Sequence, residues 1–353
     1  MSTLKPLIVI LGPTASGKTE MGLKLAKKYN GEIINADSRQ IYREMNIGTG
    51  SPILCHSEHD CHSEFISESI KNISLAVPMS SKLSVTKIGK ICGHNQKILK
   101  QVQDDNIIII DSIPHHLFHI KNPNQKFSLS QYKKLAIKTI NNIHKRGKIP
   151  ILIGGTGLYI SAIIDNLEIP KAAPNKKIRE RLEKHTEKYL FNKLKKVDPK
   201  SAKIIGENNK RKLIRAIEVY ELTGEAFSRQ QIKGESLFNV LQIGIKTDRE
   251  KLYKKIDSRV DKMIKAGLIK ETKKLSKKYS SNLPAMSGIG YLEIGQYLEN
   301  KIVLEDAAQK IKFRTHQYAR RQITWFKRDG RTKWAGNYSE AEKMVKEFLN
   351  SSQ

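Results

Sequence analysis

The sequence is poor in cysteine and has no long apolar run, and these two shortages exclude broad classes of protein. Three cysteines in 353 residues are an odd count in a long chain, which argues against the disulfide framework of a secreted domain. The longest apolar stretch near the N-terminus, Leu7 to Leu11, is too short for a signal peptide, and no run reaches the roughly 18 residues of a membrane helix. We therefore expect a cytoplasmic protein without membrane contact through a spanning helix.

Acidic residues are also scarce. The chain has 35 Asp and Glu against 64 Lys and Arg, which gives a formal net charge of +29. A surplus of this size favours a polyanionic partner, either nucleic acid or an anionic membrane surface, although part of it can reflect the composition of the genome. The 39% of hydrophobic residues suffices for a sizeable core, which excludes disorder throughout the chain.

Apolar segments alternate between strand and helix character. A strand from Pro6 to Leu11, the loop GPTASGKT, a helix from Glu20 to Tyr29 and a strand that begins at Glu32 open the chain. The pattern continues with a helix at 130–146, a strand at 149–155, a helix at 157–164 and a strand within 238–248, and then helices through Lys333. This order predicts an α/β fold with a P-loop NTPase-like parallel sheet flanked by helices.

Three regions are predicted along the chain. Residues 1–170 form the catalytic core, residues 171–235 a basic helical insertion module, and residues 236–353 the continuation of the core with C-terminal helices. Within the core, residues 53–105 are rich in Ser, His, Lys and Asn and lack sustained periodicity, so we interpret them as a disordered insertion. The cluster Cys55, His56, His59, Cys61 and His62 in this insertion does not have the two separated ligand pairs of structural zinc motifs.

The loop after the first strand matches the phosphate-binding pattern GxxxxGK[ST] and lies between a predicted strand and a predicted helix. Its glycines let successive backbone N–H groups point at phosphate oxygens, and the helix that follows adds the positive end of its dipole. Lys18 is expected to reach the terminal phosphate and Thr19 to offer its hydroxyl to Mg²⁺. The predicted binding residues are Gly12, Pro13, Thr14, Ala15, Ser16, Gly17, Lys18 and Thr19.

A phosphate loop alone does not select a reaction. An ATPase or a kinase would also need an apolar strand that ends in a carboxylate near the metal, and Ile107 to Asp111 has this form. Asp37 follows the strand at Glu32 and is expected at the carboxyl edge of the predicted sheet beside the phosphate loop, where folds of this class hold ligands. A helix cap is the alternative interpretation of both Asp37 and Thr156, which follows a glycine turn.

Several motifs together resemble the tRNA dimethylallyltransferases, also called tRNA isopentenyltransferases. Order and spacing match across nearly the whole chain except residues 53–105. The motifs are GPTASGKT at Gly12, DSRQIYREMNIGTG at Asp37, PHHLFHI at Pro114, IPILIGGTGLYI at Ile149, RKLIRAIEVYELTG at Arg211, GIGYLEI at Gly288 and RTHQYARRQITWFKRD at Arg314.

The resemblance implies transfer of a dimethylallyl group from dimethylallyl diphosphate to N6 of the adenosine immediately 3′ of the anticodon in tRNA. The phosphate loop would then hold the leaving diphosphate, where Lys18, the loop N–H groups and Mg²⁺ on Thr19 stabilise negative charge. Asp37 resembles the general base of the family. Asp37, Ser38, Arg39 and Gln40 correspond to a segment that contacts the target adenine, and Thr156 to a threonine near the reacting groups.

The resemblance also implies an RNA surface. Arg215 aligns with an arginine on the diphosphate, whereas Lys212 stands where relatives often have arginine. On spacing alone, a solvated basic face is the alternative for Arg211 and Lys212, and a buried position the alternative for Trp325. The predicted tRNA-binding residues outside the core motifs are Arg179, Arg211, Lys212, Leu213, Ile214, Arg215, Gly290, Tyr291, Arg314, Arg321 and Trp325, with Tyr318 and Arg328 on the same helical stripe as the last three.

The expected partners are therefore a tRNA anticodon stem-loop and dimethylallyl diphosphate, the expected cofactor is Mg²⁺, and the expected state is a monomer. Two other functions stay open at this point. One is a P-loop kinase or ATPase that acts on RNA or on a small molecule, and the other is an RNA-binding protein without catalytic activity.

Overall fold

The computed structural model describes residues 4–51, 101–102, 107–170, 172–230 and 232–351. Their strands form one sheet in the order β3-β4-β5-β2-β6-β1-β7-β8. The strands are β1 (Pro6–Leu11), β2 (Gly31–Asn35), β3 (Gln101–Val102), β4 (Ile107–Ile110), β5 (Ile113–His116), β6 (Ile149–Gly154), β7 (Asn239–Ile245) and β8 (Thr332–Ala335).

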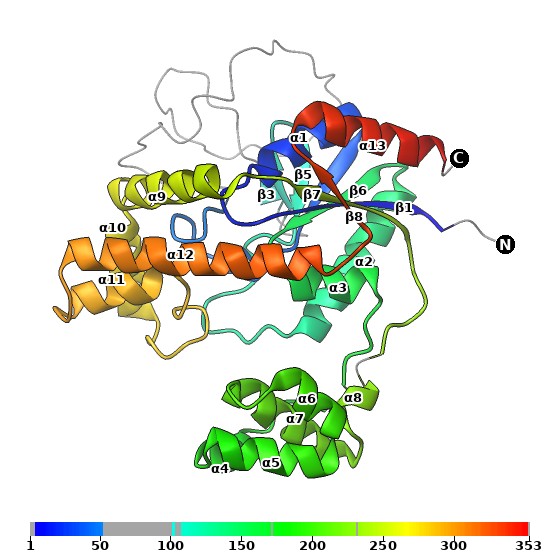
Figure 1. Ribbon diagram of the computed structural model, residues 1–353. Helices are drawn as coiled ribbons and strands as arrows, with labels where there is room; N and C mark the ends of the chain where they lie inside the picture. The colour runs from blue at the N-terminus through cyan, green and yellow to red at the C-terminus, as the bar shows by residue number, and fades with distance from the viewer. Residues whose placement is uncertain (1–3, 52–100, 103–106, 171, 231, 352–353) are drawn as a thin grey trace.

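The helices lie around this sheet (Figure 1). They are α1 (Lys18–Lys28), α2 (Leu129–Lys145), α3 (Gly157–Ile164), α4 (Lys176–Glu183), α5 (Glu187–Val197), α6 (Pro199–Ile205), α7 (Lys210–Thr223), α8 (Phe227–Gln230), α9 (Arg249–Lys265), α10 (Leu268–Lys278), α11 (Tyr291–Leu298), α12 (Leu304–Lys327) and α13 (Tyr338–Asn350).

The six strands from β5 to β8 in the sheet order run parallel, which confirms the predicted fold class. β1 lies between β6 and β7, with Ile8 paired to Ile151 on one side and to Leu241 on the other. Helices cover both faces, so the central strands are continuously apolar and have no polar side. Because the strands are parallel, their carboxyl ends meet at one edge, and this edge holds the phosphate loop.

Two hydrophobic clusters fasten helices to opposite faces of the sheet. On one face, α1 and α13 pack against Ile8 and Ile10 of β1. On the other face, α2, α3 and the end of α12 pack against Leu7 and Val9 of the same strand. Figure 1 shows α1 and α13 above the sheet and α2 and α3 below it. A third cluster joins α9 to α12 with the segment after β2, so α12 extends from this helical layer to the edge of the sheet.

The helices α4 to α8 gather in the region predicted as a helical insertion module and have a core of their own, which includes Leu190 and Leu213. Figure 1 shows this module apart from the sheet, joined to it by two connecting segments. These segments pair with each other, since the backbone N–H of Glu168 donates to the carbonyl oxygen of Ile232 at 2.9 Å. The module is therefore connected to the sheet through this one pair of segments.

The C-terminal region differs from the sequence prediction. Helix α12 ends at Lys327, and Lys333, predicted as helical, lies in strand β8 instead. The four residues of β8 are too few for a clear alternation of apolar and polar side chains, and the strand forms because β7 offers it a parallel partner, with Gln242 opposite Thr332. Helix α13 then returns over the sheet.

Asp111, the carboxylate considered for an ATPase-like metal site, does not lie at the edge of the sheet that holds the phosphate loop. β4 is antiparallel to β5, and Ile110 pairs with Ile113, so Asp111 lies in the tight turn between them with a φ of 51°. This turn is at the amino end of β5, whereas the phosphate loop is at the carboxyl edge of the sheet and follows β1, the third strand along from β5. A pattern of four isoleucines before a carboxylate cannot reveal the direction of a strand in the sheet.

Most of the predicted insertion, including its cysteine and histidine cluster, lies outside the described residues, and Gln101–Val102 within it form β3. Among the residues that the structure describes, no helix is both long enough and apolar enough to span a bilayer.

Candidate active site at the carboxyl edge of the sheet

The phosphate loop joins the end of β1 to the start of α1, as the sequence predicts. Ala15 and Gly17 have positive φ values of 64° and 88°, which curl the loop. A Cβ atom at Gly12 would lie 2.8 Å from Ser16 Oγ and 3.3 Å from Ile245 Cβ, so a larger residue there would force neighbouring side chains to move. The N-cap residue of α1 is Gly17, which has no side chain to cap the first N–H groups of the helix and so leaves them available to an anion.

Lys18 folds back into this loop, where its Nζ donates to the carbonyl oxygen of Pro13 at 3.1 Å. Burial lowers the pKa of Lys18 from 10.5 to about 8, Asp37 acts to raise it, and Arg259 lowers it further. Both electrostatic effects require these side chains to lie near the ammonium group. A buried cation of this kind gains most from an anionic ligand in the loop.

Asp37 lies just after β2 at the same edge and is held by its own strand. The buried Asn35 accepts the backbone N–H of Asp37 at 2.9 Å through Oδ1 and donates to the carbonyl oxygen of Leu117 through Nδ2 at 3.1 Å. Asp37 Oδ1 accepts the N–H of Arg39 at 2.8 Å, which makes an Asx-type turn in a segment without a helix. The helix-cap interpretation of Asp37 is therefore wrong.

Thr156 connects the turn after β6 to the Asp37 segment. Its Oγ1 accepts the backbone N–H of Ser38 at 3.0 Å and donates to Ser38 Oγ at 3.3 Å. Although Thr156 precedes α3, its side chain caps none of the helix N–H groups, so the helix-cap interpretation is wrong here too. Tyr318 of α12 also forms a hydrogen bond to Thr156, and burial, with the charge of Asp37, raises the tyrosine pKa to about 12.

Arg259 is a residue of this edge that was not predicted from the sequence. This residue lies on α9 three positions after Ile256 and seven after Leu252, and both of these pack in a cluster that includes Ala15 of the phosphate loop. Arg259 therefore shares the helical face that meets the loop. Its guanidinium donates to the carbonyl oxygen of Thr49 at 3.3 Å, and within the described part of the chain no carboxylate forms an ion pair with it. Burial lowers its pKa, which Asp37 opposes.

Helical spacing over 249–265 places Arg259 as a lone basic residue on the apolar face of the helix. The spacing does not show that this face packs against the phosphate loop.

Arg39 and Gln40 of the DSRQ motif donate side-chain hydrogen bonds to backbone carbonyl oxygens in this structure. Arg39 Nη1 donates to the carbonyl oxygen of Pro284 at 2.6 Å, and Gln40 Nε2 donates to those of Thr49 and Gly50 at 3.3 and 3.2 Å. The turn at 46–50 is further fixed by Glu271, whose carboxylate accepts three consecutive backbone N–H groups. Contact of the motif with an adenine stays a prediction.

The residues of the predicted basic and aromatic stripe on α12 differ in their exposure and contacts at this edge. Trp325 is 43% exposed and lies against Gly157, where an added Cβ atom would come within 2.4 Å of its Cδ1, whereas the adjacent Phe326 is buried in the core. Arg321 is exposed, with its guanidinium 5.9 Å from the ring of Tyr318. Arg314, farther along the helix, forms an ion pair with the buried Glu293.

The structure does not bring Arg215 to the phosphate loop. It lies on α7 in the module, where Nη1 donates to Glu218 at 2.7 Å and Nη2 to the carbonyl oxygen of Ala172 at 2.9 Å. Arg179 forms two hydrogen bonds of 2.8 Å to the same carboxylate. Glu218, fully buried, is thus the common anchor of two predicted ligand residues, and a diphosphate contact of Arg215 stays a prediction.

The other predicted RNA contacts fall into two groups. Arg211 and Lys212 are exposed at the start of α7. The side chains of three further residues are buried and cannot reach RNA as they lie here, because spacing along a motif does not tell a buried face from an exposed one. Leu213 and Ile214 belong to the core of the module, and Tyr291, which follows Gly290, is 2% exposed and donates to Glu271 at 2.7 Å.

The residues at the loop fit Mg²⁺. Thr19 is exposed in the first turn of α1, and Ser16 Oγ is buried with no hydrogen-bond partner among the described residues. Mg²⁺ prefers oxygen ligands and commonly keeps waters and substrate phosphates beside one or two protein groups. Among the residues that the structure describes, no three His, Cys, Asp or Glu side chains gather into a metal-binding group, so a site made only of protein ligands does not fit.

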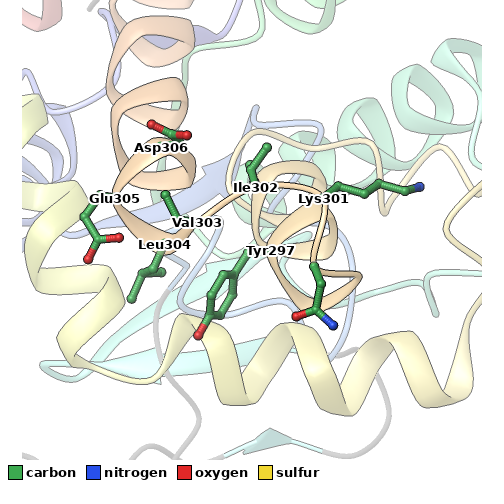
Figure 2. A pocket seen from close by; sticks show the side chains of 8 residues that line it. Tyr297, Lys301, Ile302, Val303, Leu304, Glu305 and Asp306 are labelled. Atoms are coloured by element: carbon green, nitrogen blue, oxygen red, sulfur yellow. The ribbon is translucent and has the colours of Figure 1, made fainter.

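Two surface hollows lie outside the loop itself. One of about 350 Å³ is lined by Leu11, Gly157 and Trp325 and borders the site. The other, of about 790 Å³, lies between α11 and the start of α12, and Figure 2 shows Tyr297, Lys301 and Asp306 around it. None of the predicted site residues lines this second hollow.

Comparisons with known proteins agree with this geometry. The sequence model described as IPP transferase matches residues 106–329, and the model described as isopentenyl transferase matches residues 5–60. These two ranges leave residues 61–105 unmatched. Most of the chain outside the predicted insertion therefore falls within these models.

Two curated relatives are named tRNA dimethylallyltransferase. The protein of Halothermothrix orenii is 38% identical over 359 residues, which cover 97% of this chain and 93% of the relative. The protein of Carboxydothermus hydrogenoformans is 37% identical over 354 residues, which cover 98% of this chain and 97% of the relative.

Solved structures are similar over nearly the whole chain. The tRNA isopentenylpyrophosphate transferase of Bacillus halodurans has a TM-score of 0.63 at 32% identity and covers 99% of this chain and 96% of its own. A eukaryotic dimethylallyltransferase described as acting on tRNA has a TM-score of 0.67 at 26% identity, with 98% of this chain and 77% of that chain covered. The phosphate loop, the carboxylate beside it and these matches lead to one conclusion: the chain belongs to the IPP transferase family.

Proposed function

We propose that this protein transfers a dimethylallyl group from dimethylallyl diphosphate to N6 of the adenosine immediately 3′ of the anticodon in tRNA. The observation that carries the proposal is the meeting of a phosphate loop with Asp37, whose charge acts on Lys18. A diphosphate leaving group and a proton acceptor are thereby brought to one edge of the sheet, as transfer to an amine requires.

In the transfer, the allylic C–O bond breaks and diphosphate leaves with the electron pair. A C–N bond forms to N6 of the adenosine, which loses one proton to Asp37. Lys18, the open N–H groups at the start of α1 and Arg259 stabilise the negative charge that develops on diphosphate. Mg²⁺ bound through Thr19 would neutralise part of the same charge.

Thr156 and Tyr318 keep the acceptor in place. Thr156 holds the backbone of Ser38 next to Asp37, and Tyr318 binds Thr156 from α12. Burial and the charge of Asp37 raise the pKa of Tyr318 to about 12, so its phenol stays protonated at neutral pH. Proton acceptance is thereby assigned to the carboxylate.

The RNA is expected to approach from the side of α12 where Arg321 and Trp325 are exposed. The target base has to leave the anticodon loop to reach Asp37, and an exposed indole beside the site can stack on unpaired bases. We also propose that the enzyme acts as a monomer and in the cytoplasm.

The experiment that tests the proposal is incubation of the protein with Mg²⁺, unmodified tRNA and dimethylallyl diphosphate, followed by nucleoside analysis for N6-dimethylallyladenosine. ATP in place of the prenyl donor tests the kinase or ATPase alternative. We expect prenylated adenosine with the first donor and no hydrolysis or transfer with ATP. Folded protein that hydrolyses ATP and forms no prenylated product would contradict the proposal.

A further inference from the structure

Gln322 is a buried amide on α12, and its two ends bind two different backbone segments. The side chain is 4% exposed. Its Oε1 accepts the backbone N–H of Thr14 at 3.0 Å, and its Nε2 donates to the carbonyl oxygen of Gly155 at 2.7 Å. The carboxamide supplies one acceptor and one donor at these two positions at the same time.

These two backbone segments carry the reacting groups of the proposed function. Thr14 belongs to the phosphate loop after β1, and Gly155 directly precedes Thr156 in the turn after the neighbouring strand β6. The approach is close, because a Cβ atom at Gly155 would lie 2.2 Å from Nε2 of Gln322. Gln322 therefore fixes the separation between the phosphate loop and the turn that holds the Asp37 segment.

The same stretch of α12 also meets the expected RNA side. Tyr318, one turn before Gln322, binds Thr156, and Trp325, one turn after it, is half exposed against Gly157. Arg321, adjacent in sequence, is exposed. Two turns of a single helix thus contact the phosphate loop and the turn beside Asp37, and are also exposed to solvent.

We propose that Gln322 is a positioning residue that couples RNA binding on α12 to diphosphate binding in the phosphate loop. RNA held by Arg321 and Trp325 orders this part of α12, and Gln322 transmits that order to the backbone of Thr14. Coupling of this kind is reciprocal, so diphosphate in the loop strengthens RNA binding by the same factor. The proposal rests on the proposed function.

Calorimetry with inorganic diphosphate and Mg²⁺, with and without a saturating anticodon stem-loop RNA, measures this coupling on the full chain. We expect RNA to tighten diphosphate binding by at least about fivefold in the unchanged protein, a typical coupling strength. Gln322→Met removes both hydrogen bonds and is expected to weaken diphosphate binding about tenfold and to bring the RNA effect to a factor near one. Gln322→Glu keeps the acceptor for Thr14, loses the donor to Gly155, and is expected to lose the RNA effect.

Gln317→Met on the same helix is the matched control, because within the described residues the side chain of Gln317 makes no hydrogen bond to Thr14 or Gly155, and it is expected to leave both values unchanged. A purely structural role of Gln322 would weaken diphosphate binding and leave the RNA effect intact, and this result in either folded variant would overturn the proposal. Absence of an RNA effect in the unchanged protein, with both ligands bound, would overturn it while leaving the proposed function standing.

A measurement on the unchanged protein avoids dependence on variant folding. Hydrogen exchange of the Thr14 backbone N–H is expected to slow at least about threefold when the stem-loop RNA binds, because the amide is held by Gln322. An exchange rate that does not respond to bound RNA would overturn the proposal. Protein that binds neither diphosphate nor RNA would overturn both the proposal and the function on which it rests.

Discussion

Thr156 Oγ1 accepts the backbone N–H of Ser38 at 3.0 Å across 118 residues of sequence, and this bond joins two ends of neighbouring parallel strands. It fixes the residue next to Asp37 relative to the turn after β6. Parallel strands deliver such residues to one edge, but only a side chain that crosses between the turns sets their distance. Catalytic geometry at this edge therefore depends on residues that do not react.

Replacement of the proposed proton acceptor separates chemistry from binding. Asp37→Asn keeps the acceptor oxygen for the N–H of Arg39 but has no charge to take the N6 proton. We expect kcat to fall by about 10²- to 10⁴-fold, the range of a lost general base. Single-turnover kinetics measure this loss, and filter binding measures tRNA affinity, which should change less than about threefold if the residue acts through chemistry alone. Full activity of Asp37→Asn would exclude the assigned role.

The low pKa of Lys18 predicts a pH dependence of diphosphate binding. Burial lowers this pKa to about 8 in the free protein, so the ammonium loses its proton as pH rises through 8, and attraction for diphosphate falls. Affinity measured by calorimetry should decrease from pH 7 to pH 9. The titration of diphosphate itself also contributes, and Lys18→Ala, which lacks the ammonium, isolates that contribution. An identical pH profile in both proteins would contradict the prediction.

Arg259 should act on the diphosphate although it is distant from the loop in sequence. Arg259→Gln removes a partly buried cation beside Lys18. We expect the inhibition constant of inorganic diphosphate to rise by about 10- to 100-fold, equivalent to roughly 1.5–3 kcal/mol for a hydrogen bond to a charged group. Steady-state inhibition measures this change.

Arg249 is the matched control on the same helix, because it is exposed and lies over the ring of Tyr253. Arg249→Gln should leave diphosphate inhibition unchanged. Equal effects of the two substitutions would indicate a general loss of positive charge and would remove the specific role of Arg259.

The buried carboxylate of Glu218 should stabilise the helical module. Burial acts to raise its pKa, but hydrogen bonds from Arg179 and Arg215 hold it below the usual value. Such a lowered pKa contributes stability that is present above the unfolded value near pH 4.5 and is lost as pH falls below it. Glu218→Gln leaves two guanidinium groups without their anion, so we expect a loss of about 3–5 kcal/mol in unfolding free energy.

Urea denaturation measures this loss, and Glu180→Gln provides the control. Glu180 forms an exposed 3.6 Å pair with Lys176, and the loss of such a pair costs less than about 1 kcal/mol. A Glu218 variant as stable as the control would show that the two arginines do not depend on this carboxylate.

The central fold was predictable because its signals are local. The strand at Pro6–Leu11, the loop and the helix after it follow from an apolar run, a glycine pattern and helical spacing. The position of Asp37 at the carboxyl edge of the sheet was predictable for the same reason, since Asp37 follows a strand that is recognisable in the sequence. β8 and the direction of β4 were not, because short strands take their direction from a partner.

The supporting residues of the site were not predictable in the same way. Arg259 and Gln322 reach the phosphate loop from helices more than 200 residues away in sequence. Their positions result from the packing of α9 and α12 around the sheet. The spacing of apolar residues along a helix does not show how that helix packs against other elements. Burial of Leu213 and Tyr291 was missed because a motif shows which residues recur together and not which of them face solvent.

Joint quantification of the two products tests the central claim most directly. In one reaction with Mg²⁺, unmodified tRNA and labelled dimethylallyl diphosphate, released diphosphate and N6-dimethylallyladenosine are counted together. The account predicts equal amounts of the two products, with neither formed when the adenosine 3′ of the anticodon is replaced by another nucleoside. Diphosphate release without prenylated adenosine, or transfer to a tRNA that lacks this adenosine, would contradict it.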